Sequence, residues 1–72
     1  MEKRQQLSGE LYLAIVEGTE RQLAVRDGTK VGDILRCELR GASRYFLARV
    51  RSIDLGIATI AITHVHEGLR NG

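Results

Sequence analysis

The residues of this sequence best suited to bind a ligand are five arginines within one 20-residue segment. They are Arg36, Arg40, Arg44, Arg49 and Arg51. Segment 34–53 has one acidic residue against these five, a net charge of +4, while the whole chain is only +2. A guanidinium group binds phosphate or carboxylate through two hydrogen bonds and stacks on flat rings. We therefore expect an anionic ligand at this segment, where Tyr45 also offers a ring on which a nucleic-acid base can stack.

Other residues with chemical potential do not form a recognisable catalytic or metal-binding pattern. His64 and His66 are two residues apart and would share a strand face, but no third and fourth metal ligands stand at suitable spacing. Cys37 alternates with Leu35 and Leu39, which is typical of a core residue and not of a nucleophile. The sequence therefore predicts no enzyme activity, metal or cofactor.

The length and composition predict a single domain. A chain of 72 residues has room for one core, and its 43% hydrophobic and 28% charged residues are ordinary for a globular protein. We expect this domain over residues 7–65, with disordered tails at 1–6 and 66–72, which lack apolar periodicity. The single cysteine and the absence of a long apolar run favour a cytoplasmic location, away from membranes.

Glycines divide the chain into five apolar runs of strand length, at residues 11–16, 22–26, 34–40, 45–53 and 57–65. The expected fold is mainly β, a small five-stranded and partly open β-barrel. The run Leu11 to Val16 also fits a short helix, because Ser8 could cap its start and Gly18 its end. The β-branched pair Ile15 and Val16 favours the strand slightly, so both readings stay open.

The runs at 34–40 and 45–53 predict a β-hairpin with Arg40 opposite Tyr45. In this register Leu39, Cys37 and Leu35 face Phe46, Ala48 and Val50 on an apolar side. The other side collects Arg36, Arg40, Arg49 and Arg51 around Tyr45, with Arg36 directly across from Arg49. Because like charges that face each other are destabilising, this arrangement favours an anion lying over the sheet, such as RNA. The alternative is a solvated face on which Glu38, diagonal to Arg49, partly neutralises the charge.

Residues 12–53 resemble the ASCH domain, a relative of PUA domains. The resemblance rests on Val16-Glu17-Gly18, on the segment 21–26 (RQLAVR) and on the segment 30–36 (KVGDILR). It implies a compact PUA-like barrel, with an SH3-like barrel as the alternative, that binds RNA or, in some members, hydrolyses a modified nucleoside. The lysine and threonine that the hydrolytic members use are matched here by Arg21 and Gln22. Arginine cannot shuttle a proton near neutral pH, so binding is expected in place of catalysis.

The final run is apolar on both faces, which suggests a second kind of function. Ile57, Ile60 and Ile62 would need cover on both sides of the sheet, and a second copy of the chain could supply it. A non-catalytic RNA-binding or other nucleic-acid-binding module is therefore the leading hypothesis. A protein-interaction or homodimerisation module of a larger complex is the second, and an amidohydrolase acting on modified nucleosides is the third.

Overall fold

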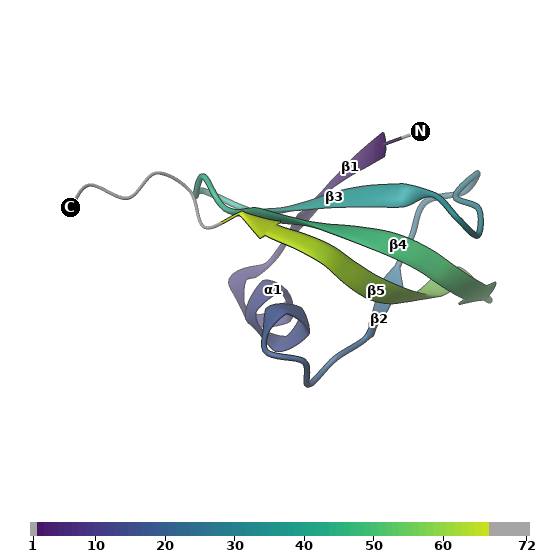
Figure 1. Cartoon of the computed structure of the whole chain (residues 1–72), viewed down its shortest axis with the longest axis horizontal. Coiled ribbons are helices and arrows are strands. Elements are labelled where there is room, and N and C mark those ends of the chain that lie inside the picture. Colours follow the sequence, from purple (N-terminus) through teal and green to yellow (C-terminus); the bar gives the residue numbers. More distant parts are fainter. Residues whose placement is uncertain (1, 67–72) are drawn as a thin grey trace.

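The computed structural model describes residues 2–66, which form one mixed five-stranded sheet and one short helix (Figure 1). In chain order the elements are β1 (Glu2–Leu7), α1 (Gly9–Val16), β2 (Gln22–Ala24), β3 (Ile34–Leu39), β4 (Tyr45–Asp54) and β5 (Ile57–His66). The order of strands in the sheet is β1-β3-β4-β5-β2, and β1 and β2 do not pair with each other. The expected mainly β fold, a small and partly open barrel, is confirmed. Within residues 2–66, no helix is long and apolar enough to cross a bilayer.

The first residues form a strand, so the prediction of a disordered tail over residues 1–6 was wrong for residues 2–6. β1 runs parallel to β3, with Glu2 opposite Ile34 and Leu7 opposite Leu39. Among residues 3–7 of this strand, Leu7 alone is buried. Backbone pairing with a strand some 30 residues away, and not apolar side chains, holds most of β1 in place. Of the second expected tail, His66 ends β5, and residues 67–72 lie outside the described part of the chain.

The segment Leu11 to Val16 is helical, so the slight preference for a strand was wrong and the helical alternative is correct. The hydroxyl of Ser8 accepts a hydrogen bond from the backbone N–H of Leu11 at 3.3 Å, and Gly18 follows the helix with a φ of +88°. Tyr12 and Ile15 are each only 2% exposed. Their spacing of three residues places both on one helix face, and burial of that face outweighs the β propensity of the segment.

The β3–β4 hairpin forms in a register two residues away from the expected one. Glu38 lies opposite Tyr45, Cys37 opposite Phe46 and Arg36 opposite Leu47, so Arg36 does not face Arg49. The loop then comprises residues 40–43, because the N–H of Leu39 donates to the carbonyl of Arg44 at 2.9 Å. Both registers have four-residue loops, and a shift of two residues keeps every side chain on its own face. The apolar pattern and the loop length therefore could not distinguish them.

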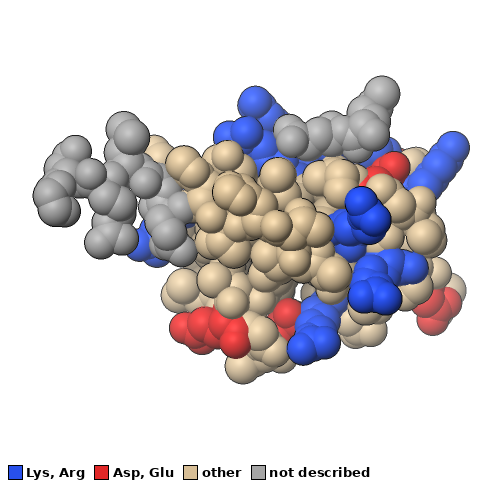
Figure 2. All heavy atoms as spheres, viewed as in Figure 1, with Lys and Arg blue, Asp and Glu red and all other residues tan. Residues whose placement is uncertain are grey.

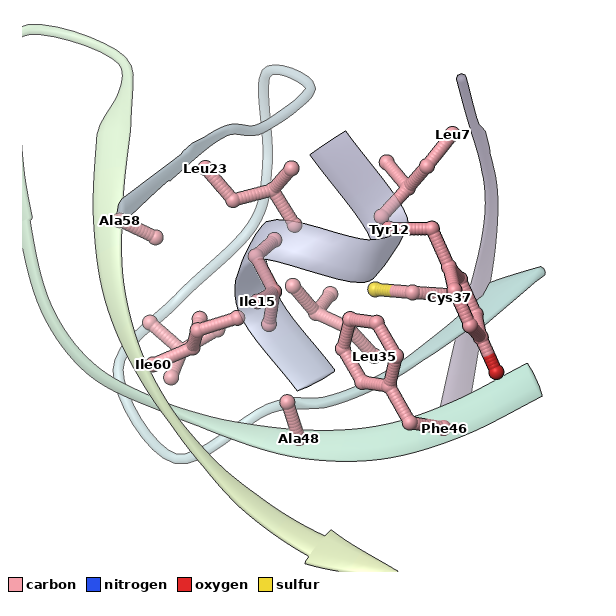
Figure 3. Packing of buried hydrophobic residues seen from close by; sticks show 11 residues of the cluster. Leu7, Tyr12, Ile15, Leu23, Leu35, Cys37, Phe46, Ala48, Ala58 and Ile60 are labelled. Carbon is pink, nitrogen blue, oxygen red and sulfur yellow. The ribbon is translucent and has the colours of Figure 1, made fainter. Parts of the chain in front are cut away.

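The core lies between the sheet and α1 (Figures 1 and 3). Its buried members are Leu7, Tyr12, Ile15, Leu23, Leu35, Cys37, Phe46, Ala48, Val50, Ala58 and Ile60. The rings of Tyr12 and Phe46 are 5.3 Å apart between centroids, and Ile15 points from the helix toward the sheet (Figure 3). The helix thus covers one face of the sheet.

Two irregularities interrupt the pairing of β4 with β5. Leu47 pairs with His64 and Ala48 with Ile62, which leaves Thr63 as an extra residue in β5. Val50 pairs with Ile60 and Ser52 with Thr59, which leaves Arg51 as an extra residue in β4. An extra residue in one strand changes which face the following side chains occupy.

Side chains of β1 connect the two edges of the open sheet. The Nε2 of Gln5 donates to the carbonyl of Ala24 at 2.7 Å, and the Nζ of Lys3 donates to the carbonyl of Gly28 at 3.0 Å. Lys3 also lies 3.7 Å from a carboxylate oxygen of Asp33. These contacts bring β1 close to β2 and to the turn that follows it, which gives the sheet its barrel-like curvature without a closing ladder.

Candidate nucleic-acid interface

The sheet face opposite α1 carries polar, basic and ring-bearing side chains in cross-strand rows. One row crosses β1, β3, β4 and β5 through Gln6, Glu38, Tyr45 and His66. The next row contains Arg4, Arg36, Leu47 and His64. Residues that are paired across neighbouring strands point to the same side of the sheet, so both rows belong to one surface. We call this surface the outer face.

Three of these side chains form a stack on the outer face. The guanidinium carbon of Arg36 lies 3.9 Å from the centroid of the Tyr45 ring. The ring of His66 stacks on Tyr45 with 4.7 Å between centroids and 21° between planes, and His64 lies farther away at 6.4 Å. Cation–π and ring contacts of this kind hold flat groups parallel to one another.

Glu38 fixes the position of Arg36 in this stack. Its Oε2 accepts a hydrogen bond from the Nε of Arg36 at 3.0 Å, and the two side chains remain 24% and 29% exposed. Both border a hollow of about 590 Å³, which Gln6, Tyr45, His66 and the hairpin loop also line. The hollow therefore combines a carboxylate, two arginines and two rings at the solvent surface.

The six residues expected at the binding site do not all come together. Arg36, Arg44 and Tyr45 line the hollow, and Arg49 lies farther along the outer face, opposite Ile34 and Ala61. Arg40 is exposed just after β3, where its backbone N–H donates to the carbonyl of Leu7. Arg51 is the extra residue of β4 and lines a different groove, beside Ile15 and Val16 of α1. Arg51 therefore does not line the hollow that contains Tyr45.

The structure adds four residues to the site that were not expected there. Arg4 and Gln6 come from β1, and His64 and His66 come from the end of β5. The two histidines do share a face, as their spacing indicated, but they contact a tyrosine. In the described part of the chain, no three His, Cys, Asp or Glu side chains lie close enough together to hold a metal ion.

The cysteine lies on the opposite side of the sheet from this surface. Cys37 is fully buried, and burial raises the pKa of its thiol from 9.0 to about 12. A thiol in such a setting stays protonated and is unreactive at neutral pH.

The three isoleucines expected at an interface differ in exposure. Ile60 is 4% exposed and belongs to the core, so its expected place in an interface was wrong. Ile57 and Ile62 are 39% and 37% exposed. Ile62 lines the groove beside the C-terminal end of α1, together with Arg21 and Arg51.

In Figure 2, Lys and Arg side chains gather on the right half of the molecule, where β4 ends. Basic charge is thus not confined to the outer face.

No family model matches the chain, and a search of curated proteins gives no match. The resemblance to the ASCH domain stays a prediction.

Proposed function

We propose that this chain is a non-catalytic module that binds single-stranded RNA through the outer face of its sheet. The observation that carries the proposal is the stack of Arg36, Tyr45 and His66 on the sheet face that α1 does not cover. Flat, cationic and aromatic groups side by side on an exposed sheet suit a nucleic acid whose bases are unstacked.

The charges of the outer face support the same proposal. Glu38 is paired with Arg36, which partly neutralises the stack, but Arg4 and Arg49 are exposed on the same surface and form none of the described salt bridges. Arg4 lies directly beside Arg36 in the pairing of β1 with β3. A row with two neighbouring guanidinium groups is destabilising unless an anion lies over it, and a phosphate backbone supplies such an anion.

The proposal is tested by the salt dependence of binding. Fluorescence anisotropy with a labelled single-stranded RNA should show affinity that falls as salt rises, with a slope near −0.7 for each phosphate contact. The double variant Arg36→Ala with Arg49→Ala should bind more weakly and lower the magnitude of this slope by about 1.4 if each arginine contacts one phosphate.

The matched control is Arg21→Ala with Arg26→Ala. It removes the same charge from exposed positions on either side of β2, away from the stack, and should keep most of the slope. Affinity that does not depend on salt would refute the proposal. An equal loss in both double variants would also refute it, because it would assign binding to net charge alone.

A second candidate function is self-association through β5, and the sheet topology favours it. β2 pairs only with residues 57–59 of β5, and the N–H of Ile60 donates to the carbonyl of Arg21. From residue 61 to residue 66, no described strand pairs with this side of β5. An unpaired edge with an exposed Ile62 can add the same strand of a second copy across a two-fold axis.

Sedimentation equilibrium tests this second candidate. The wild type should show a mass that rises toward the dimer with concentration, and Ile62→Lys should give a folded monomer. A monomer mass for the wild type across the measured range would exclude self-association.

A further inference from the structure

We propose that the hollow beside Glu38 and Tyr45 binds a guanine base and so gives the RNA interaction a base preference. This inference rests on the proposed function, because the base is taken to belong to a nucleic acid that lies on the outer face. The observation behind it is that the side chain of Arg36 already fills this site with a flat, hydrogen-bonding group.

Arg36 fills a position defined by two contacts. Its guanidinium lies over the Tyr45 ring at 3.9 Å, and its Nε donates to Oε2 of Glu38 at 3.0 Å. The site thus holds a flat group that presents N–H donors to a carboxylate while its face covers an aromatic ring. The N1, C2 and N2 atoms of guanine are themselves a guanidine fragment within a flat ring, with N–H donors along one edge. A guanine can therefore replace the Arg36 side chain in both contacts.

The carboxylate of Glu38 distinguishes guanine from the other bases. A carboxylate accepts hydrogen bonds and does not donate them. Guanine offers two adjacent donors, N1–H and the N2 amino group, which match the two oxygens of one carboxylate. Adenine and cytosine each place an acceptor nitrogen beside their amino group, and uracil has a single N–H between two carbonyl groups. Only guanine makes two hydrogen bonds to Glu38 without bringing an acceptor against it.

The surroundings allow this exchange. The hollow of about 590 Å³ opens between the hairpin loop and the end of β5, next to Glu38 and Tyr45. The side chain of Arg36 is 29% exposed, so its ion pair with Glu38 reaches solvent and is held less strongly than a fully buried pair. Once displaced, its guanidinium remains on the outer face beside Arg4, where it can contact a phosphate of the bound strand.

The position of Glu38 also argues against a surface that binds phosphate alone. A carboxylate at the centre of a basic face repels a phosphate backbone, and β3 carries it directly opposite the ring of the site. Its placement becomes favourable when a base edge, and not a phosphate, lies against it.

The experiment compares short oligoadenylates that differ at a single central position, by fluorescence anisotropy at low salt. The strand with one guanosine should bind about tenfold more tightly than the strand of adenosines alone, the discrimination expected of a pair of hydrogen bonds to a base edge. A strand with inosine, which lacks the 2-amino group, should lie between them.

Glu38→Gln tests the role of the carboxylate directly. The amide keeps an oxygen that can accept from Arg36 but places an N–H₂ group against the guanine edge, so the preference for guanosine should disappear. Binding of the adenosine strand should not weaken, because a negative charge has been removed. Glu17→Gln, at the end of α1, makes the same change of charge elsewhere and should retain the preference. Circular dichroism of each variant confirms that the fold is kept.

The outcomes separate the two proposals. If both strands bind with equal affinity and normal salt dependence, the guanine inference is overturned and the proposed function stands. If Glu38→Gln keeps the full preference for guanosine, the role of Glu38 is overturned. If neither strand binds in a salt-dependent way, the proposed function fails and the guanine inference fails with it.

Discussion

Two engineered disulfides can establish which residue of β4 faces Arg36, on which the geometry of the candidate site depends. The pairs are Arg36→Cys with Leu47→Cys and Arg36→Cys with Arg49→Cys, each in a Cys37→Ala background that removes the native thiol. The observed register places Leu47 opposite Arg36, whereas the register expected from the sequence places Arg49 there. We expect the first pair to form a disulfide and the second pair to remain reduced.

The expected difference follows from strand geometry. The N–H of Leu39 donates to the carbonyl of Arg44, so hydrogen-bonded and non-hydrogen-bonded pairs alternate from that point, and Arg36 with Leu47 is a non-hydrogen-bonded pair. The Cα atoms of such a pair are about 4.5 Å apart, within the range of a disulfide. Arg49 lies two residues farther along β4, about 6.8 Å, which puts its Cα about 8 Å from that of Arg36. This separation exceeds the limit of roughly 7 Å for a disulfide without backbone movement.

The assay is mild oxidation followed by alkylation of remaining thiols and intact mass measurement. The observed register predicts that the first variant resists alkylation after oxidation, while the second takes up two alkyl groups. Rapid closure of the second pair alone would show that Arg36 faces Arg49. The stack of Arg36 on Tyr45, and with it the guanine inference, would then be wrong.

Three further predictions concern the remaining parts of the fold. A hydrogen bond from the backbone N–H of Lys30 lowers the pKa of Asp33, and the nearby charge of Lys3 lowers it further. The ionised Asp33 carboxylate therefore stabilises the fold above about pH 4, and this stabilisation is lost as the pH falls through the lowered pKa. Asp33→Asn should therefore lower the melting temperature at pH 7, and the difference from the wild type should narrow below pH 4; a constant difference would contradict this. Because the pKa of Cys37 is raised to about 12 from 9.0, the native thiol should hold about a thousandfold less thiolate than an unperturbed one, and it should react with a thiol reagent only after denaturant is added. Fast reaction of the native protein would show that β3 does not bury this side chain. In urea denaturation, Ile60→Ala should lower the free energy of unfolding by about 2–5 kcal/mol and Ile62→Ala by roughly 1 kcal/mol, because of these two residues only Ile60 is buried. Equal decreases would place both side chains in the core.

The sequence predicted the faces of the β3–β4 hairpin correctly and its register incorrectly, for one physical reason. Apolar alternation reports which side of a strand is buried, and this side is unchanged by a shift of two residues. Cys37 and Phe46 are therefore buried, as expected, although each has a different partner from the expected one. Whether Arg36 faces Arg49 depends on which pair of residues closes the hairpin loop. Because the loop has four residues in both registers, its length did not indicate which pair closes it.

β1 could not be predicted because it carries no apolar alternation and its backbone pairs with a strand far away in the sequence. It is a polar segment whose partner, β3, begins more than 30 positions farther along the chain. A parallel pairing of this kind leaves no local turn signal. Arg4 and Gln6 were consequently assigned to a tail, although they complete two rows of the outer face.

The histidines of the site depend on a single extra residue in β5. Ala58 and Ile60 face the core, and Ile62 lies opposite the buried Ala48, so regular alternation would carry positions 64 and 66 to the same side. Thr63 interrupts this alternation, and its hydroxyl donates to the carbonyl of Leu47 at 3.3 Å.

After Thr63 the faces are exchanged. Val65 packs against the core opposite Phe46, and His64 and His66 turn to the outer face, where both lie near Tyr45. The apolar residues Ala58, Ile60 and Ile62 before the irregularity and the two histidines after it therefore lie on opposite faces of β5. A pattern read along β5 with a constant period of two places Val65 on the same side as Ile57 and Ala61, which is one reason why the sequence showed a strand apolar on both sides. In the structure Val65 lies on the core side and the two histidines lie on the outer face.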